Sequence, residues 1–194
     1  MKILVACEFS GIVREAFAKR GHDAWSCDLL PTEIPGNHIQ GDVLEIMNNG
    51  WDLMIAHPPC TYLCRNSASL LNTQTGRMEK MIESASLFSS LWNADIEKVC
   101  IENPVMHSRG YEQIGFKWNQ TIQPWQFGHD YSKRTCLWLK NLPELQPTDI
   151  VTLTYITTKN GYKATRGWYE MPRNSRARSR TFQGIADAMA EQWG

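Results

Sequence analysis

The feature that most constrains the fold is a short apolar run, W-D-L-M-I-A at residues 51–56, which ends in His57-Pro58-Pro59-Cys60. The run shows no alternation of polar and apolar residues, which is typical of a strand buried on both faces of a sheet. Two successive prolines cannot continue a central strand, so the backbone leaves the sheet here in a defined direction. The chain therefore presents a thiol on a stiff loop at the end of a buried strand.

The N-terminal part of the chain alternates apolar runs with segments of helical spacing. Residues 2–7 and 23–27 predict strands on either side of a helix over 12–20. A long helix over 78–92 then leads to a second buried strand over 98–101. Strands that alternate with helices indicate an α/β fold, in which helices cover both faces of a mostly parallel sheet.

The pattern changes beyond residue 120. Residues 121–128 and 134–140 predict paired antiparallel strands, and residues 151–156 are also rich in β-forming residues. Residues 157–180 are rich in glycine, lysine and arginine, and residues 181–193 predict a closing helix. We therefore expect the parallel sheet to end in an antiparallel C-terminal strand.

Length and composition set broad limits. A chain of 194 residues can bury the core of one domain, and its formal net charge of zero neither indicates nor excludes a nucleic-acid partner. No secretory leader is recognisable, and no apolar run approaches the ~18 residues that span a bilayer. We therefore expect a cytoplasmic protein with no membrane partner. Its six cysteines are then expected to be free thiols.

Polar residues follow each of the four predicted parallel strands. Ligands of open parallel sheets lie outside the carboxyl ends of the strands, so these residues are expected to meet at one rim. They are Glu8-Phe9-Ser10-Gly11, Asp28, His57-Pro58-Pro59-Cys60 and Glu102-Asn103-Pro104.

The segment Glu8–Gly11 forms a tight turn from a strand into a helix. The N–H groups at the start of that helix favour an anionic group such as a carboxylate or a phosphate. Asp28, at the end of the next strand, could accept hydrogen bonds from a ribose diol, or could be a solvated loop carboxylate. Asp42 could meet an adenine amino group, but in isolation it is better explained as the N-cap of a helix over 43–48.

Cys60 and Glu102 form a plausible pair of nucleophile and acid on this rim. Burial could keep Glu102 protonated, so that it donates a hydrogen bond to a ring nitrogen. The alternatives are an inert thiol and a surface carboxylate. Zinc bound by His57, Cys60 and Cys64 lacks an obvious fourth ligand, so no metal site is predicted.

The order of these residues resembles that of the S-adenosylmethionine-dependent cytosine-C5 methyltransferases, and most closely the compact members encoded by bacteriophages. E-F-S-G is similar to the first, cofactor-binding motif of the family, P-P-C at 58–60 to its catalytic cysteine loop, and E-N-P at 102–104 to its E-N-V motif. K-R-T at 133–135 lies where the family has an arginine-bearing active-site motif. Together these short motifs touch most of residues 1–140.

The resemblance implies a Rossmann-like methyltransferase fold and a role for each matching residue. Cys60 would attack C6 of cytosine, Glu102 would hydrogen-bond N3 and the exocyclic amine, and Arg134 would help to hold the base or its phosphate. The methyl group of S-adenosylmethionine would then pass to C5 of a cytosine that has left its helix. The implied cofactor-binding residues are Glu8, Phe9, Ser10, Gly11, Asp28, Asp42 and Pro58.

The resemblance also implies a division of the chain. Residues 1–140 would form the catalytic domain, residues 141–180 a short basic insertion that could recognise the target, and residues 181–194 a helix that packs back on that domain. The expected nucleic-acid contacts within the insertion are Arg166, Trp168, Arg173, Arg176 and Arg178. So short a reader implies little sequence specificity, a very short site, single-stranded DNA or a partner that supplies recognition. The insertion could also be a solvated loop.

Two other classes of function stay open on the sequence alone. A related enzyme that modifies a free nucleotide or RNA would keep Cys60 and Glu102 but would not need the arginines. A non-catalytic binding protein would need neither side chain. The target sequence and the oligomeric state are not encoded in any motif that we recognise. For a phage-encoded protein, the expected location is the cytoplasm of the host cell.

Overall fold

The computed structural model describes residues 1–172 and 174–194, and its centre is a seven-stranded sheet with the strand order β3-β2-β1-β4-β5-β7-β6. Strands β1 to β5 run parallel where they pair, whereas β7 is antiparallel to both β5 and β6. The fold is therefore the expected α/β sheet with an antiparallel C-terminal strand. The strands are β1 (Lys2–Ala6), β2 (Asp23–Asp28), β3 (His38–Gln40), β4 (Leu53–Ala56), β5 (Lys98–Pro104), β6 (Gln120–Ile122) and β7 (Thr135–Lys140).

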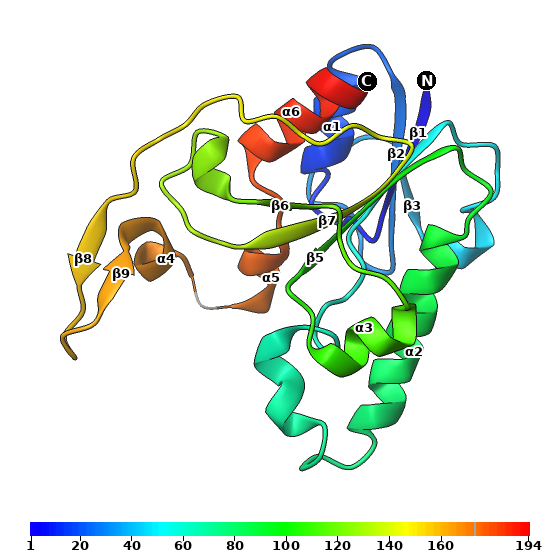
Figure 1. Cartoon of the computed structure of the whole chain (residues 1–194). Coiled ribbons are helices and arrows are strands. Elements are labelled where there is room, and N and C mark those ends of the chain that lie inside the picture. Colours follow the sequence, from blue (N-terminus) through cyan, green and yellow to red (C-terminus); the bar gives the residue numbers. More distant parts are fainter. Residues whose placement is uncertain (173) are drawn as a thin grey trace.

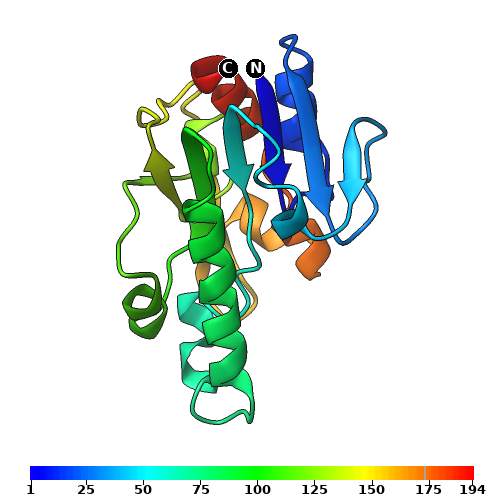
Figure 2. The same ribbon diagram turned by 90° about the vertical axis from the view of Figure 1, so that its right-hand side faces the viewer.

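Helices cover both faces of this sheet (Figure 1). On one face, α1 (Ile12–Ala18) packs against α6 (Gln183–Trp193), whose apolar residues lie in the same core cluster. On the other face, α2 (Arg77–Trp92) packs against α3 (Ser108–Ile114). Figure 2 shows α2 standing in front of the sheet, with α1 and α6 behind it.

The two covered faces explain why the central strands show no alternation. Successive residues of β1 are buried from Ile3 onward, with Ile3 packed toward α1 and α6 and Leu4 toward α2. In β4, Leu53 and Met54 are divided between the same two clusters. A strand between two apolar layers needs apolar residues at every position, which confirms the prediction made from residues 51–56.

Three expectations about local structure need correction. The strand expected over 121–128 ends at Ile122, because Pro124 has no N–H to donate and begins a 3-10 helix, η3 (Pro124–Gln126). The strand expected over 151–156 begins only at Tyr155, since the amides of Val151 and Thr154 bond to the loop around Trp125 and Asp130. Strand β3 and helix α3 have no counterpart among the elements expected from the sequence.

An arm, defined here as residues 151–171, projects from the sheet (Figure 1). It consists of the antiparallel hairpin β8 (Tyr155–Thr157) and β9 (Lys163–Thr165), followed by α4 (Arg166–Glu170). The short helix α5 (Ser175–Ser179) then connects the arm to α6. Among the described residues, the longest helices fall short of the length and apolar character that a membrane crossing requires.

Candidate active site

The topology of the sheet brings together at one rim the segments that follow β1, β2, β4 and β5 and the segment that precedes β7. The order of the parallel strands reverses between β1 and β4, so the loops that follow them leave in opposite directions and open a crevice. Because β7 is antiparallel to β5, its first residue, Thr135, pairs with Pro104 at the end of β5. Lys133 and Arg134 therefore lie at the same rim as the ends of the parallel strands.

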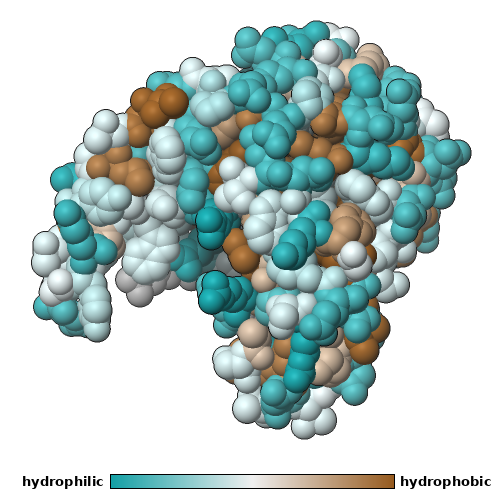
Figure 3. All heavy atoms as spheres, viewed as in Figure 1, coloured by the Kyte–Doolittle hydropathy of each residue, from teal (hydrophilic) through white to brown (hydrophobic). Residues whose placement is uncertain are grey.

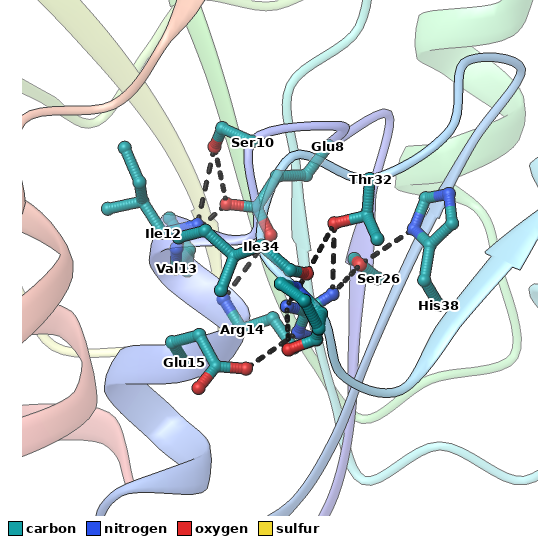
Figure 4. Close-up of polar contacts among 11 residues, drawn as sticks. Glu8, Ser10, Ile12, Val13, Arg14, Glu15, Ser26, Thr32, Ile34 and His38 are labelled. Atoms are coloured by element: carbon teal, nitrogen blue, oxygen red, sulfur yellow. Dashed lines mark hydrogen bonds and ion pairs between the residues drawn. The ribbon is translucent and has the colours of Figure 1, made fainter.

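Glu8 is buried in the loop between β1 and α1, with 4% of its surface exposed. Its carboxylate accepts hydrogen bonds from the amides of Val13 (2.7 Å) and Arg14 (3.2 Å) and from the hydroxyl of Ser10 (3.1 Å), as Figure 4 shows. The amides at the start of α1 thus already have an internal carboxylate partner. The anionic ligand expected there is a side chain of the protein itself.

Gly11 completes this turn in a conformation that other residues rarely adopt. Its φ is 75°, and a Cβ atom at this position would lie 2.7 Å from Nη2 of Arg14. The Arg14 guanidinium is fully buried and donates to Glu15, Ser26, Thr32 and the carbonyls of Ile34 and Pro35 (Figure 4). The loop after β2 is therefore anchored beside the first loop, which fixes one wall of the crevice.

Asp28 and Asp42 lie on the same side of the crevice, at the ends of β2 and β3. Asp28 accepts a hydrogen bond from the amide of Leu30 (2.9 Å). Asp42 caps a 3-10 helix, η1 (Val43–Glu45), through the amide of Leu44 (3.0 Å), which confirms the capping role weighed for it. Burial, followed by the charges of these two carboxylates, raises the pKa of Cys7 to about 12. The two acids and Cys7 therefore share one neighbourhood.

The loop that carries Cys60 is held from two sides. The amide of His57 donates to the carbonyl of Ala6, and the side chain of Asn103 donates to the carbonyl of Pro58 (3.4 Å). Further along, His107 bonds through Nε2 to the carbonyl of Tyr62 (3.0 Å). The prolines set the exit of the strand as expected, and the connection from β5 to α3 holds the segment after Cys60 in place. Cys60 is thus part of a braced turn.

Glu102 pairs with His57 across the ends of β5 and β4. The distance from Nδ1 of His57 to Oε2 of Glu102 is 2.8 Å, and the two side chains are 11% and 14% exposed. Burial acts to raise the pKa of Glu102, but the hydrogen bond from His57, with the charges of Lys133 and His57, lowers that pKa to about 2. The expectation that burial protonates Glu102 is therefore wrong for the free protein, in which Glu102 is ionised.

The pKa of His57 is shifted in the direction that favours an ion pair with Glu102. Burial acts to lower the pKa of His57, but the hydrogen bond and the charge of Glu102 raise it above its ordinary value of 6.5. Among the described residues, Nε2 of His57 and Oδ1 of Asn103 are buried without a hydrogen-bond partner. Buried polar atoms of this kind cost about 1–3 kcal/mol each and call for a functional explanation.

The surroundings of Cys60 favour its protonated thiol form. A hydrogen bond with Cys64, then burial and the charge of Glu102, raise the pKa of the Cys60 thiol well above its ordinary value. Lys133 is the neighbouring cation that acts in the opposite direction on this pKa. Sequence reasoning gave the catalytic role in K-R-T to Arg134, whereas the structure places Lys133 beside Cys60, Glu102 and His57.

A cleft opens beside this cluster, between the arm and the segment that follows Cys60 (Figure 3). Its volume is about 450 Å³. Among its described lining residues four are cationic and none is acidic, and Trp168 adds an aromatic face. The basic residues are Arg65, Lys133, Arg134 and Arg178. Such a lining suits a ligand that carries negative charge and a flat ring.

The expected nucleic-acid contacts separate into different environments. Trp168 and Arg178 line the cleft, with the guanidinium 5.7 Å from the ring centroid. Arg166 is exposed on the arm, and Arg173 lies outside the described residues. Arg176 instead bonds to Glu33 (2.9 Å) and lies 5.1 Å from the ring of Phe9. The structure therefore directs part of the basic segment toward the first loop rather than toward the cleft.

Comparisons with known proteins agree with the fold. No model of a known protein family and no curated protein matches the sequence. A structure of the Entamoeba histolytica methyltransferase EhMeth shares 11% identity, with a TM-score of 0.50, over 77% of this chain and 57% of its own. A candidate DNA modification methyltransferase encoded within an E. coli prophage shares 15% identity, with a TM-score of 0.49, over 78% of this chain and 52% of its own.

The likeness to EhMeth supports the fold alone, because only 11% of the residues are identical. The chain spans just over half the length of the solved structures that it matches. The sheet order, the antiparallel β7 and the likeness to EhMeth together show a Rossmann-like fold of the methyltransferase kind.

Proposed function

We propose that the protein transfers a methyl group from S-adenosylmethionine to C5 of cytosine in DNA, through a covalent bond between Cys60 and the base. The observation that carries this proposal is the meeting of Cys60, Glu102 and Lys133 at one rim, beside a basic cleft with an aromatic wall. A thiol and a carboxyl group beside a cation that itself lines a ring-binding cleft match the needs of nucleophilic attack on a pyrimidine.

The other half of the crevice suits the proposed cofactor. A dinucleotide cofactor requires free amides at the first helix for its pyrophosphate, but here Glu8 occupies them. S-adenosylmethionine carries no phosphate, and Asp28 and Asp42 offer carboxylates to its ribose hydroxyls and adenine. When bound, this cofactor supplies the electrophilic methyl group. We therefore assign Glu8, Phe9, Ser10, Gly11, Asp28, Asp42 and Pro58 to its site.

The protein groups then have distinct tasks in the reaction. The Cys60 thiolate forms a bond to C6 of the base, and the ring electrons move toward N3 and C4. Protonated Glu102 hydrogen-bonds N3 and stabilises that charge, while C5 becomes the nucleophile. Loss of the C5 proton and departure of the thiolate restore the aromatic ring. Lys133 favours the thiolate, and Arg134 is placed at the cleft wall, where it can hold a phosphate or the base.

A nucleic acid is the class of substrate that the cleft suits. The exposed aromatic side chains of the arm and the cationic lining can stack on bases and contact phosphates, which are the two modes by which proteins bind single strands. A cytosine must leave its helix to reach Cys60. The cleft therefore suits a flipped base or an unpaired strand.

Nucleoside mass spectrometry tests the proposal. DNA would be incubated with the protein and a cofactor carrying a deuterated methyl group, in parallel with the Cys60→Ala variant. We expect deuterated 5-methylcytosine from the wild type alone. Label in a free nucleotide or in RNA instead of DNA, each offered in a parallel reaction, would replace DNA as the substrate, and equal results from both proteins would contradict the assignment of Cys60.

A further inference from the structure

The free protein holds its two central groups in the protonation states opposite to those that the proposed reaction needs. Attack on C6 requires a Cys60 thiolate, and stabilisation at N3 requires a protonated Glu102, because neutral N3 of cytosine is a hydrogen-bond acceptor. A hydrogen bond with Cys64 and burial raise the pKa of the Cys60 thiol, while the 2.8 Å contact with His57 outweighs burial and lowers the pKa of Glu102 to about 2, so these shifts favour a thiol and a carboxylate. A proton must therefore leave Cys60 for solvent, and another must reach Glu102, when the base arrives.

We propose that His57 supplies this proton, passing it from Nδ1 to Oε2 of Glu102 as the base enters the site. The two atoms are 2.8 Å apart in a hydrogen bond between largely buried side chains. In the transfer the Nδ1–H bond breaks, an O–H bond forms on Oε2 of Glu102, and the imidazolium becomes a neutral imidazole; the new O–H then rotates from Nδ1 toward N3 of the base. The reverse transfer follows when the product leaves. This inference rests on the proposed function.

The charged groups that pack around His57 act in both directions on its pKa, and the net effect favours the protonated ring. Glu102 on β5 and Glu8 after β1 raise the pKa of His57, while Lys133 before β7 acts to lower it. Lys133 also stabilises the Glu102 carboxylate before the transfer. Charge stays constant within the pair, because an ion pair becomes a neutral acid and a neutral base. A neutral pair is the better tolerated state once a flat base displaces water from the site.

The geometry separates this role from one of simple support. A residue that only positions Glu102 needs a hydrogen-bond donor where Nδ1 lies, and an asparagine amide can provide one. A residue that supplies a proton must also be able to lose it. His57→Asn keeps the donor and cannot transfer a proton, so this variant distinguishes the two roles. His57→Leu removes both and serves as the reference for full loss.

The first experiment is the pH dependence of kcat for methyl transfer to DNA. We expect His57→Asn to lose about 10²-fold in kcat at pH 7.5. Its activity should rise as the pH falls, because solvent then protonates Glu102 directly. Wild-type kcat should decline only as the pH rises above the raised pKa of His57. If His57→Asn had the same kcat as the wild type at pH 7.5, the inference would be overturned.

The second experiment uses the free protein and does not depend on catalysis. Nitrogen-15 NMR of the imidazole should show His57 protonated at both nitrogens at pH 6.5, and Glu102→Gln should lower the pKa at which it titrates. A neutral His57 in the wild type at that pH would overturn the inference, even where methylation is normal. A protonated His57 in a protein that methylates no cytosine would instead reject the proposed function, and the inference with it. Melting curves of His57→Asn provide the control for folding.

Discussion

The rim of the sheet and the projecting arm differ in how far their side chains are buried and held by hydrogen bonds. At the rim, Glu8, His57 and Glu102 are largely buried, and hydrogen bonds at 2.7–3.2 Å fix their positions. On the arm, Tyr162 and Trp168 are 75% and 41% exposed. The strand topology therefore fixes the buried side chains of the rim, while the arm offers an exposed surface to a partner. Changes at the rim are therefore expected to alter turnover, and changes on the arm to alter binding.

Removal of the nucleophile should have the largest effect. We expect Cys60→Ala to lower kcat at least about 10³-fold, because the proposed bond to C6 of the base forms at the Cys60 sulfur. Binding of DNA, measured by fluorescence anisotropy, should change little. Cys64→Ala is the matched control and should stay active. It should also speed alkylation of Cys60 at neutral pH, because loss of the Cys64 hydrogen bond lowers the pKa of Cys60.

Lys133 and Arg134 are adjacent in the sequence, but we expect their replacement to change different kinetic constants. Lys133→Met should lower kcat roughly 10-fold, because the charge of Lys133 favours the Cys60 thiolate. Arg134→Met should mainly raise KM, since Arg134 lines the cleft and is exposed. Steady-state kinetics on one DNA substrate would distinguish them. A loss of kcat in Arg134→Met alone would support the catalytic role that the family resemblance implies for Arg134.

Two neighbours on the arm test whether the arm binds substrate. Trp168 and Tyr169 are 41% and 39% exposed, but of the two only Trp168 lines the cleft. Trp168→Ala should weaken the binding of single-stranded DNA about 10-fold through lost stacking. Tyr169→Ala should have a much smaller effect. Equal effects of the two changes would show that the arm contributes general surface rather than a wall of the cleft.

The smallest expected effect is a pH-dependent change in the free energy of unfolding when the ion pair of Glu102 and His57 is removed. The pKa of Glu102 lies at about 2 in the folded protein, below the ordinary 4.5, so its stabilisation is present above pH 4.5 and is lost as the pH falls. The pKa of His57 is raised above 6.5, so its contribution is present below pH 6.5 and is lost as the pH rises.

The wild type should therefore exceed Glu102→Gln in free energy of unfolding most clearly between about pH 4.5 and 6.5. Urea titrations should show a difference on the order of 1–2 kcal/mol in this window. Arm variants such as Tyr169→Ala should show no such pH dependence. A difference that is flat across this range would mean that Glu102 and His57 do not form an ion pair.

The sequence was most informative where burial or proline restricted the backbone. The run over 51–56 had to lie between two apolar layers, and the prolines after it had to direct Cys60 away from the sheet. The convergence of Cys60 and Glu102 at one rim followed from parallel strands alone. The capping role of Asp42 could also be weighed beforehand, because it depends on residues two positions away.

Contacts between distant segments could not be predicted from the sequence. His57 meets Glu102 over a separation of 45 residues, and the choice of Lys133 over Arg134 depends on how β7 enters the sheet. The five hydrogen bonds of Arg14 likewise depend on the path of the loop after β2. The sequence does show His57 directly after a buried strand and two adjacent cations before β7. Neither feature indicates which distant residue the side chain will contact.

The most direct test of the account is to trap the bond between Cys60 and the base. DNA with 5-fluorocytosine in place of cytosine would be incubated with the protein and S-adenosylmethionine, since fluorine at C5 cannot leave as a proton does. We predict a stable protein–DNA adduct that is attached through Cys60, depends on the cofactor and is absent in Cys60→Ala. No adduct, or an adduct through another residue, would contradict the covalent mechanism.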